Sequence, residues 1–279
     1  MSTQATASAP VISAGRRQGL ARVTRSAMPG LIATIVCIAA WELAIRAAGP
    51  ESGVSIPAPS QIFGALVALL GDSGFWVAAG QTLLSSGLGL IIATVAALAL
   101  GVLYGTFVFV RHSTTGILEL LRPIPPVALL PVGLLLFGTS LEMKLALVIY
   151  TSFWPVFIQT TYGMRDIDST LIDMARIHRV RRMRRLAEIV IPSIGPYFVV
   201  GLRLSVVGAL IASIVTELIG GAPGLGYALG IAQSTGQTES MYALIIAIGL
   251  LGLGLDRLFS LIERRTMRWS PNNRERGNS

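Results

Sequence analysis

The side chains that could do chemistry in this chain are concentrated in one polar segment between two long apolar runs. The segment covers residues 166–188, and its second half, Arg176 to Arg185, is rich in arginine. A segment this charged has to leave a lipid bilayer. Tied to the ends of two apolar runs, the segment is well placed to transmit force from a partner. Alternatively, its arginines only anchor the helix ends and bind anionic lipid headgroups. Composition alone leaves both alternatives open.

Two further ionisable residues lie inside apolar runs, where such residues are usually functional. Arg203 lies about 14 residues into its run, about 21 Å along a helix. It could attract an anionic solute on a translocation path between two chains. Alternatively, it forms a salt bridge or carbonyl contact that locks helices, or it snorkels towards a membrane surface. Glu217, four turns further along a similar face, is expected near the opposite mouth as a gate or a packing residue.

Other chemistry is not supported by the residue types or their spacing. Cys37 is the only cysteine, and His112 and His178 are far apart, so neither an internal disulfide nor a metal cluster is expected. We find no nucleophile and base pair and no supported carboxylate pair, which argues against an enzyme. The glycine-dense stretch 220–226 lacks the lysine of a phosphate-binding loop, and we interpret it as a turn or short re-entrant piece. The chain is therefore expected to bind no cofactor or metal itself.

The elements that position these residues are predicted to be membrane helices. Hydrophobic residues make up 53% of the 279 residues and charged residues 13%, against about 25% charged in a soluble domain. The net charge of +8 comes from arginines that flank apolar runs, which favours anchoring at a membrane over binding of nucleic acid. We predict an all-α membrane protein with about six spans, over 28–48, 82–109, 117–137, 142–162, 189–218 and 241–262.

Details of the spans are also predicted from residue types. The third span contains Pro123, Pro125, Pro126 and Pro131, so it cannot be one straight helix. A short interfacial helix is expected over Ser60–Leu70, with Ser60 as its cap. As domains we expect a disordered tail over 1–27, one membrane domain over 28–265 with a loop over 163–188, and a basic tail over 266–279.

The arginines predict the orientation. Most of them lie in or beside the two tails, in the turn at Arg111 and in the 166–188 segment, whereas 49–80 and 220–240 contain neither lysine nor arginine. Because cytoplasmic loops carry the excess of positive charge, we expect both termini and the arginine-rich loop on the cytoplasmic side. Within that loop, Thr170 and Asp173 loosely match a capping box. Leu171, Met174 and Ala175 follow at helical spacing and would form one short apolar face.

At this loop the chain resembles the permease subunits of bacterial ABC importers. These permeases carry a Glu-Ala-Ala element, a glycine three or four residues on, and a later Ile-x-x-Leu-Pro. Here Asp173-Met-Ala175 and Ile189-Val-Ile-Pro192 stand at those places. Between residues 30 and 265 the chain also looks like the sulfonate, taurine and nitrate branch, through Ile56-Pro-Ala-Pro-Ser60, Arg122-Pro-Ile-Pro-Pro-Val-Ala-Leu-Leu-Pro131, Phe137-Gly138, Gly201-Leu-Arg-Leu204 and Gly221-Ala-Pro-Gly-Leu-Gly-Tyr227.

The resemblance implies a type I importer permease of the bacterial inner membrane that carries a small, anionic solute. Two copies of a separate ATPase would use the ATP, a second permease copy would complete the path, and an extracytoplasmic binding protein would deliver the solute. The loop would be the coupling helix, and the residues implied in coupling are Asp173, Met174, Ala175, Arg176, Arg179, Ile191 and Pro192. Arg179 stands at the family's glycine position, where a positive φ would cost arginine about 1 kcal/mol.

Two other classes of function remain open from the residues. A stand-alone channel or secondary transporter would use the arginine-rich loop only as an anchor. A membrane scaffold would use the same loop to hold a cytoplasmic protein without dependence on ATP.

Overall fold

The computed structural model describes residues 18–48 and 56–266, and these residues contain helices and no strand. The chain divides into two compact parts, one ending at Phe63 and one beginning at Gly64. The all-α prediction is therefore confirmed for the described residues. Most of the predicted N-terminal tail (1–17) and of the C-terminal tail (267–279) lies outside them.

The first part contains helix α1 (Gln18–Ala48) and the start of α2 (Pro59–Gly71). Helix α1 contains the first predicted span and begins ten residues before it, inside the stretch expected to be a tail. The Ser60 cap prediction is wrong, because Ser60 lies within α2 and its backbone N–H and hydroxyl both donate to Glu42, at 3.0 and 2.8 Å. The Gln61 side chain instead accepts from the Ala58 N–H at 2.9 Å, as one half of a capping box does.

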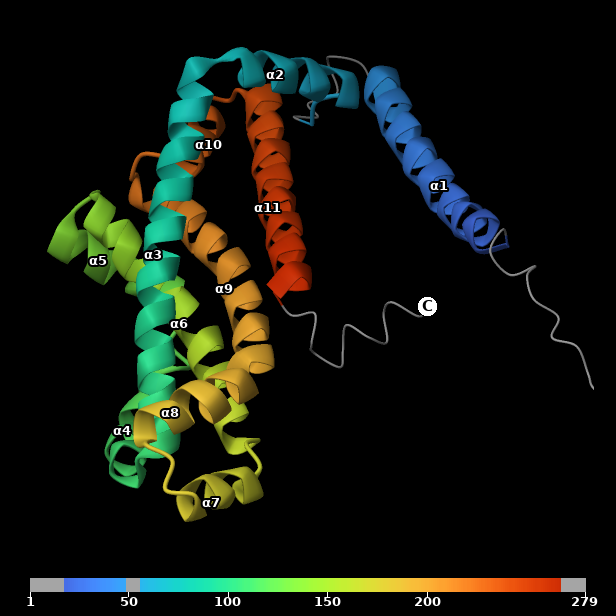
Figure 1. Ribbon diagram of the computed structural model, residues 1–279. Coiled ribbons are helices and arrows are strands. Elements are labelled where there is room, and N and C mark those ends of the chain that lie inside the picture. Colours follow the sequence, from blue (N-terminus) through green and yellow to red (C-terminus); the bar gives the residue numbers. More distant parts are fainter. Residues whose placement is uncertain (1–17, 49–55, 267–279) are drawn as a thin grey trace, which may run out of the picture. The chain divides into compact units, whose positions relative to one another are not determined.

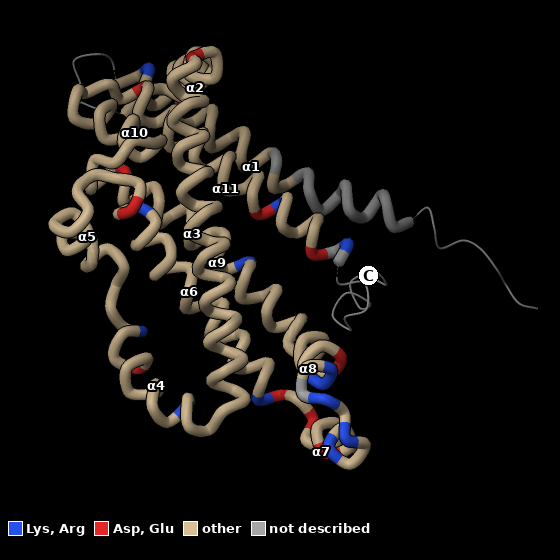
Figure 2. The backbone as a smooth tube through the Cα atoms, turned by 60° about the vertical axis from the view of Figure 1, so that its left-hand side comes forward, with Lys and Arg blue, Asp and Glu red and all other residues tan. Residues whose placement is uncertain are grey.

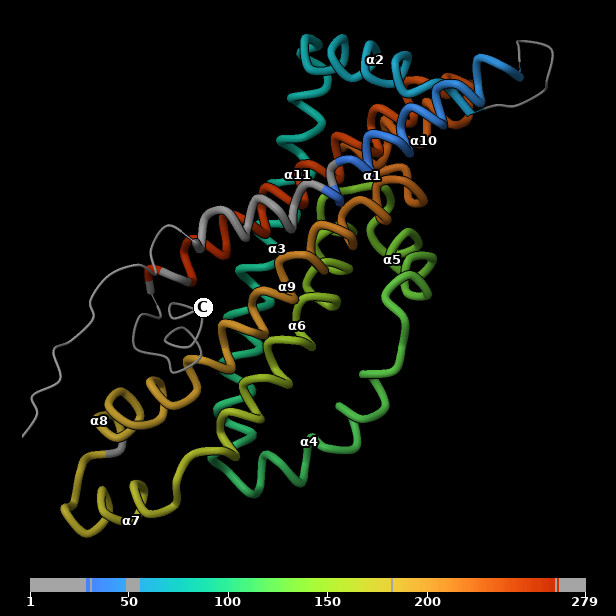
Figure 3. The backbone as a smooth tube through the Cα atoms, turned by 90° about the vertical axis from the view of Figure 1, so that its right-hand side faces the viewer, coloured from blue at the N-terminus to red at the C-terminus, as the bar shows by residue number. Residues whose placement is uncertain are grey.

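The second part contains the long helices of the bundle and short helices at its ends (Figure 1). In chain order they are α3 (Ser73–Thr106), α4 (Val108–Leu121), the 3₁₀ turn η1 (Pro126–Leu129), α5 (Leu130–Phe137), α6 (Leu141–Arg165), α7 (Ser169–Ile177), α8 (Arg182–Arg185), the π-helical turn η2 (Leu186–Val190), α9 (Ile191–Gly220), α10 (Leu225–Ser234) and α11 (Thr238–Thr266). Figures 1 and 3 show α4, α7 and α8 at one end and α10 at the other. We call these the α7 end and the α10 end.

Four of the described helices are long and apolar enough to cross a membrane, over Ser73–Thr106, Leu141–Arg165, Met183–Gly220 and Thr238–Glu263. A fifth crossing is possible if α4 is joined with Pro126–Phe137, a pair bent by 87°. This bend falls where four prolines interrupt the third predicted span, so the prediction of a broken helix is confirmed. Helix α3 begins nine residues before the predicted Thr82, after Asp72 accepts a capping bond from the Gly74 N–H at 3.1 Å.

The centre of the bundle is α6, which packs against α3 on one side and α9 on the other. Small residues allow the close approach of α3: a Cβ on Gly101 would lie 2.8 Å from Thr160 Cγ2, and one on Gly105 would lie 2.6 Å from Met164 Cβ. Polar contacts join the same helices, since the Ser205 hydroxyl of α9 donates to the Ser152 carbonyl of α6 at 2.7 Å. Helices α3, α6 and α9 thus form one closely packed unit.

Candidate functional sites in the α7 loop and the helix bundle

Helix α7 begins at an aspartate cap. Asp168 accepts a hydrogen bond from the Thr170 backbone N–H at 2.8 Å, and this bond is the main reason that the pKa of Asp168 lies below its ordinary value. The prediction of a cap at Thr170 is therefore wrong by two residues. An Asx turn of this kind cannot be distinguished in sequence from a threonine cap, because Asp168, Ser169 and Thr170 are all good capping residues.

The surface of α7 combines exposed apolar side chains with exposed charges. Ala175 is buried, whereas Met174 is 56% exposed and Ile177 77% exposed. Leu171 is exposed as well, so only Ala175 of the predicted apolar face packs inward. Asp173 and Arg176 form an ion pair of 3.0 Å at the surface. Figure 2 shows that basic residues gather on and around α7 and α8. This surface presents apolar side chains surrounded by charge, as protein contact surfaces do.

Arg179 ends α7 in a left-handed conformation. Its φ is 51°, and it is the one described residue other than glycine with a positive φ. The Val180 N–H donates to the Ala175 carbonyl at 2.9 Å, and the Arg179 N–H donates to the Arg176 carbonyl at 3.0 Å. These two bonds form a Schellman motif, in which glycine usually occupies the position of Arg179. Arginine thus adopts the left-handed conformation that glycine would supply at this position.

The return from α7 to the bundle passes through a π-helical turn. α8 leads into η2, and Ile191 and Pro192 then open α9, with Pro192 in the first turn where a missing N–H is tolerated. The Tyr197 hydroxyl of α9 donates to Asp166 Oδ2 at 2.7 Å, which fastens the start of the loop to its end. The two long helices α6 and α9 are thus joined at the base of α7.

Arg203 forms an ion pair within the chain. Its Nε and one terminal nitrogen contact the two carboxylate oxygens of Asp256 on α11, at 3.1 and 3.2 Å. A second carboxylate, that of Glu263, lies 4.0 Å away. Of the alternatives stated for Arg203, the structure therefore contains the salt bridge between helices. Asp256 was missed by sequence reasoning because it lies 53 residues away, and no spacing rule connects the two positions.

Glu217 is fully buried and is the centre of a polar network. Lys144 Nζ of α6 lies 2.6 Å from Glu217 Oε1, and both side chains are at most 3% exposed. The carboxylate also accepts from the Thr82 hydroxyl of α3 at 2.8 Å and from the Ser213 hydroxyl at 3.1 Å. Of the two roles predicted for Glu217, this geometry corresponds to packing.

The same network holds the glycine-dense loop at the α10 end. The Gly226 N–H donates to Glu217 Oε2 at 2.9 Å, and Lys144 Nζ donates to the Pro223 carbonyl at 2.8 Å. Gly224 has a φ of 153°, and a Cβ there would collide with the Glu217 carboxylate. Glycine is required at this position by both conformation and space. The predicted turn at 220–226 is confirmed, and it turns around a buried carboxylate.

Lys144 was not recognised as a candidate from the sequence, although it is the only lysine of the chain. It borders a cavity of about 310 Å³. Its three N–H donors already have three acceptors, because the Gln81 carbonyl lies 3.4 Å from Nζ in addition to Glu217 and Pro223. Lys144 therefore has no donor left for a ligand in that cavity.

Comparison with known proteins places this arrangement in a family. Residues 89–268 match the family described as the binding-protein-dependent transport system inner membrane component. The chain belongs to this family. The match contains α6, α7 and α9, so the α7 loop, Arg203 and the Lys144–Glu217 pair lie within the family's domain.

Relatives of this permease come from the branch that its motifs resemble. It is 28% identical over 242 residues to the putative aliphatic sulfonates transport permease protein SsuC of Bacillus subtilis, covering 87% of each chain. It is 28% identical to the nitrate import permease protein NrtB of Leptolyngbya laminosa, covering 70% of each chain. The resemblance to the ABC importer permeases of the sulfonate and nitrate branch is thereby confirmed.

Solved structures with a similar fold are also ABC transporters. The MetNI methionine ABC transporter in an inward-facing conformation matches with a TM-score of 0.58 and 18% identity, over 66% of this permease and 92% of that chain. An amino acid ABC transporter with histidines matches with a TM-score of 0.57 and 20% identity, over 69% and 94%. The type I importer fold is thus shown. Membership of this family implies an ATPase and a binding protein as partners.

Proposed function

We propose that this permease forms the translocation path for a small, anionic solute of the sulfonate or nitrate type and is driven by a separate ATPase. The names of its relatives support the solute class. The proposal includes two copies of the permease, two ATPase subunits, and an extracytoplasmic protein that delivers the solute. The permease itself binds no cofactor and catalyses no reaction, and ATP is used by its partner.

The observation that carries the coupling role is the form of α7. It is a short helix with exposed apolar side chains, and the hydrogen bond between Tyr197 and Asp166 fastens its base between α6 and α9. Force applied to α7 would reach two long helices of the bundle through these contacts. We propose that Asp173, Met174, Ala175, Arg176 and Arg179 contact or shape the contact with the ATPase, and that Ile191 and Pro192 transmit its movement.

The proposed orientation places the α7 end and both termini in the cytoplasm of a bacterium with this permease in its inner membrane. The concentration of arginine at the α7 end supports it. The α10 end, with its glycine-dense loop, would then face the binding protein. The arginines beside the membrane would also contact anionic lipid headgroups.

The partner prediction is tested by native mass spectrometry of the tagged permease purified from its own membrane. A mass equal to two permeases and two ATPases supports the importer. A permease that appears alone and transports alone supports a channel or secondary transporter instead. A stable partner without ATPase activity supports a scaffold.

The coupling role is tested with two exposed methionines as a matched pair. Met174 lies on α7 and is 56% exposed, and Met183 lies on α8 and is 79% exposed. Truncation of an interface side chain at a contact costs more than 1 kcal/mol where that side chain is an energetic anchor. In proteoliposomes with the ATPase, Met174→Ala is expected to lower stimulated ATP hydrolysis and uptake together, and Met183→Ala is expected to leave both unchanged. Equal effects of the two variants would contradict docking through α7.

A further inference from the structure

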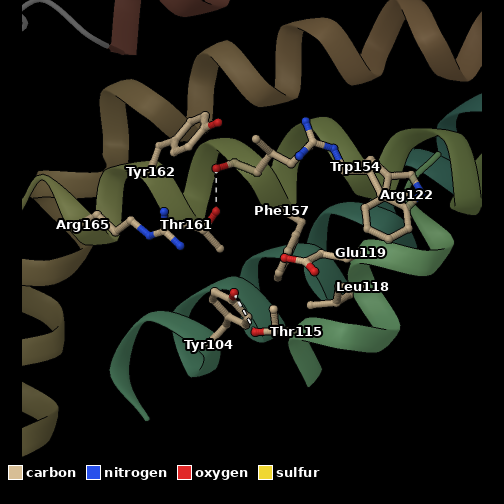
Figure 4. A pocket seen from close by; sticks show the side chains of 11 residues that line it. Tyr104, Thr115, Leu118, Glu119, Arg122, Trp154, Phe157, Thr161, Tyr162 and Arg165 are labelled. Atoms are coloured by element: carbon tan, nitrogen blue, oxygen red, sulfur yellow. Dashed lines mark hydrogen bonds between the residues drawn. The ribbon is translucent and has the colours of Figure 1, made fainter. Parts of the chain in front are cut away.

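A second cavity lies at the α7 end, between the last turns of α3, the helix α4 and the second half of α6 (Figure 4). Its volume is about 170 Å³. It is separate from the Lys144–Glu217 network, and neither α7 nor Arg203 borders it. Three charged side chains line it, namely Glu119, Arg122 and Arg165. Glu119 lies on α4, Arg122 directly follows that helix, and Arg165 is the last residue of α6 (Figure 4).

These three charged residues are exposed, and they differ from Arg203 and Lys144 in their pairing. Arg203 is paired with Asp256 and Lys144 with Glu217. Within the part of the chain that the structure describes, by contrast, neither guanidinium of the cavity has a carboxylate within 4.0 Å. Glu119 likewise has no ion-pair partner there. Two cationic groups and one anionic group thus border one small cavity with their ion-pairing capacity unused.

Aromatic and polar side chains complete the wall. Phe157 is buried, and Trp154 packs against it with the two ring centroids 6.5 Å apart. The Tyr104 hydroxyl lies 3.1 Å from Thr115 Oγ1, which fixes the phenol ring against α4. Tyr162 also lines the cavity. The cavity therefore offers apolar ring surface next to charges of both signs.

We propose that this cavity binds a small zwitterion that carries an oxyanion and an ammonium group joined by a short apolar link. The guanidinium groups of Arg122 and Arg165 take the oxyanion, because planar guanidinium groups donate paired hydrogen bonds to such groups. The Glu119 carboxylate takes the ammonium, and the rings contact the link. Because the Glu119 carboxylate repels an anion and attracts a cation, a ligand that carries both charges places each next to a side chain of opposite sign.

Two sources could supply this chemistry. One is a soluble aminosulfonate, and the other is the phosphate and ammonium of a phosphatidylethanolamine headgroup, since the cavity lies at one end of the bundle. Both present an oxyanion and an ammonium separated by two carbons. The inference does not depend on which solute the importer carries.

The experiment uses the full chain in micelles of a neutral maltoside detergent. Trp41, Trp76 and Trp269 are changed to Phe, so that Trp154 alone reports occupancy by its fluorescence, and calorimetry measures the same titrations. The soluble probes are taurine and ethanesulfonate, which differ only in the ammonium group. In the lipid arm, phosphatidylethanolamine is compared with phosphatidylglycerol in mixed micelles.

The expected result has two parts. Taurine, phosphatidylethanolamine or both bind about tenfold more tightly than the matched probe without the ammonium, which corresponds to about 1.4 kcal/mol. Glu119→Gln removes this preference. Arg122→Gln and Arg165→Gln each weaken binding about tenfold, whereas Arg111→Gln, on α4 but outside the cavity lining, leaves it unchanged.

Three outcomes would overturn the inference. One is equal binding of the probes with and without the ammonium in both arms. Another is an effect of Arg111→Gln as large as that of Arg122→Gln, which would indicate attraction by net charge. The third is the absence of any binding in either arm. Arg122→Lys controls for folding, since it keeps the charge and is expected to weaken binding less than Arg122→Gln. Saturation with taurine alone identifies a soluble ligand, and saturation with phosphatidylethanolamine alone identifies the headgroup.

Discussion

Replacement of Lys144 by methionine tests the buried network most directly. Glu217 is fully buried and Lys144 Nζ lies 2.6 Å from its carboxylate, so Lys144→Met leaves an anion inside the bundle without its cation. Removal of one partner of a buried ion pair costs about 3–5 kcal/mol. The hydroxyls of Thr82 and Ser213 and the Gly226 N–H still donate to the carboxylate, which places the expected loss at the lower end of that range.

The double variant Lys144→Met with Glu217→Gln separates the ion pair from the rest of the network. Glutamine is neutral and close to glutamate in shape, so it leaves no buried charge, and most of the stability is expected to return. The free energy of unfolding is measured by titration with sodium dodecyl sulfate in mixed micelles. Arg203→Met serves as the comparison, because the side chains of Arg203 and Asp256 are 43% and 31% exposed, whereas those of Lys144 and Glu217 are at most 3% exposed.

Comparison of Lys144→Met with the double variant and with Arg203→Met gives a clear refutation. If Lys144→Met and the double variant lose the same free energy, the cost does not come from an unpaired carboxylate. If Lys144→Met lowers the free energy of unfolding no more than Arg203→Met does, the Lys144–Glu217 pair is not desolvated as its geometry indicates. Loosening of the 221–226 loop, detected by faster hydrogen exchange at Gly226, is expected in Lys144→Met and not in Arg203→Met, because Lys144 donates to Pro223 of that loop.

Three further predictions concern the loop and the outer helices. Arg179→Gly relieves the strain of a left-handed φ of 51° and is expected to stabilise α7 by up to about 1 kcal/mol. Uptake by the reconstituted importer should be retained or improved. Complete loss of uptake would contradict the alignment of this loop with the family motif. The charge-reversing pair Arg203→Asp with Asp256→Arg should restore the uptake that either single change lowers, whereas no recovery would show that Arg203 acts on something other than Asp256. The hydrogen bond from Thr170 lowers the pKa of Asp168. The cap therefore stabilises α7 fully at pH values above the ordinary pKa of aspartate and loses this effect as the pH falls through the lowered pKa. Amide exchange in the first turn of α7 should become faster over that acidic range, and Asp168→Ala should abolish the pH dependence.

Local rules predicted the parts of this protein that depend on neighbouring residues. The broken third span follows from the prolines at 123–131, which interrupt a helix whatever surrounds them. The same rules failed where several residues compete for one local role. Thr170 and Ser60 were predicted as caps, but Asp168 caps α7, and Gln61 bonds back to the Ala58 N–H before α2.

The sequence by itself determined the membrane class, the helical fold and the family, because long apolar runs admit few structures in a bilayer and the motifs recur in order along the chain. Only the tertiary structure decided which charges meet. Lys144 and Glu217 are 73 positions apart, on helices whose contact depends on side-chain packing over their whole length, and no period in the sequence encodes that distance. The same holds for Arg203 with Asp256 and for the charges that border the cavity between α4 and α6.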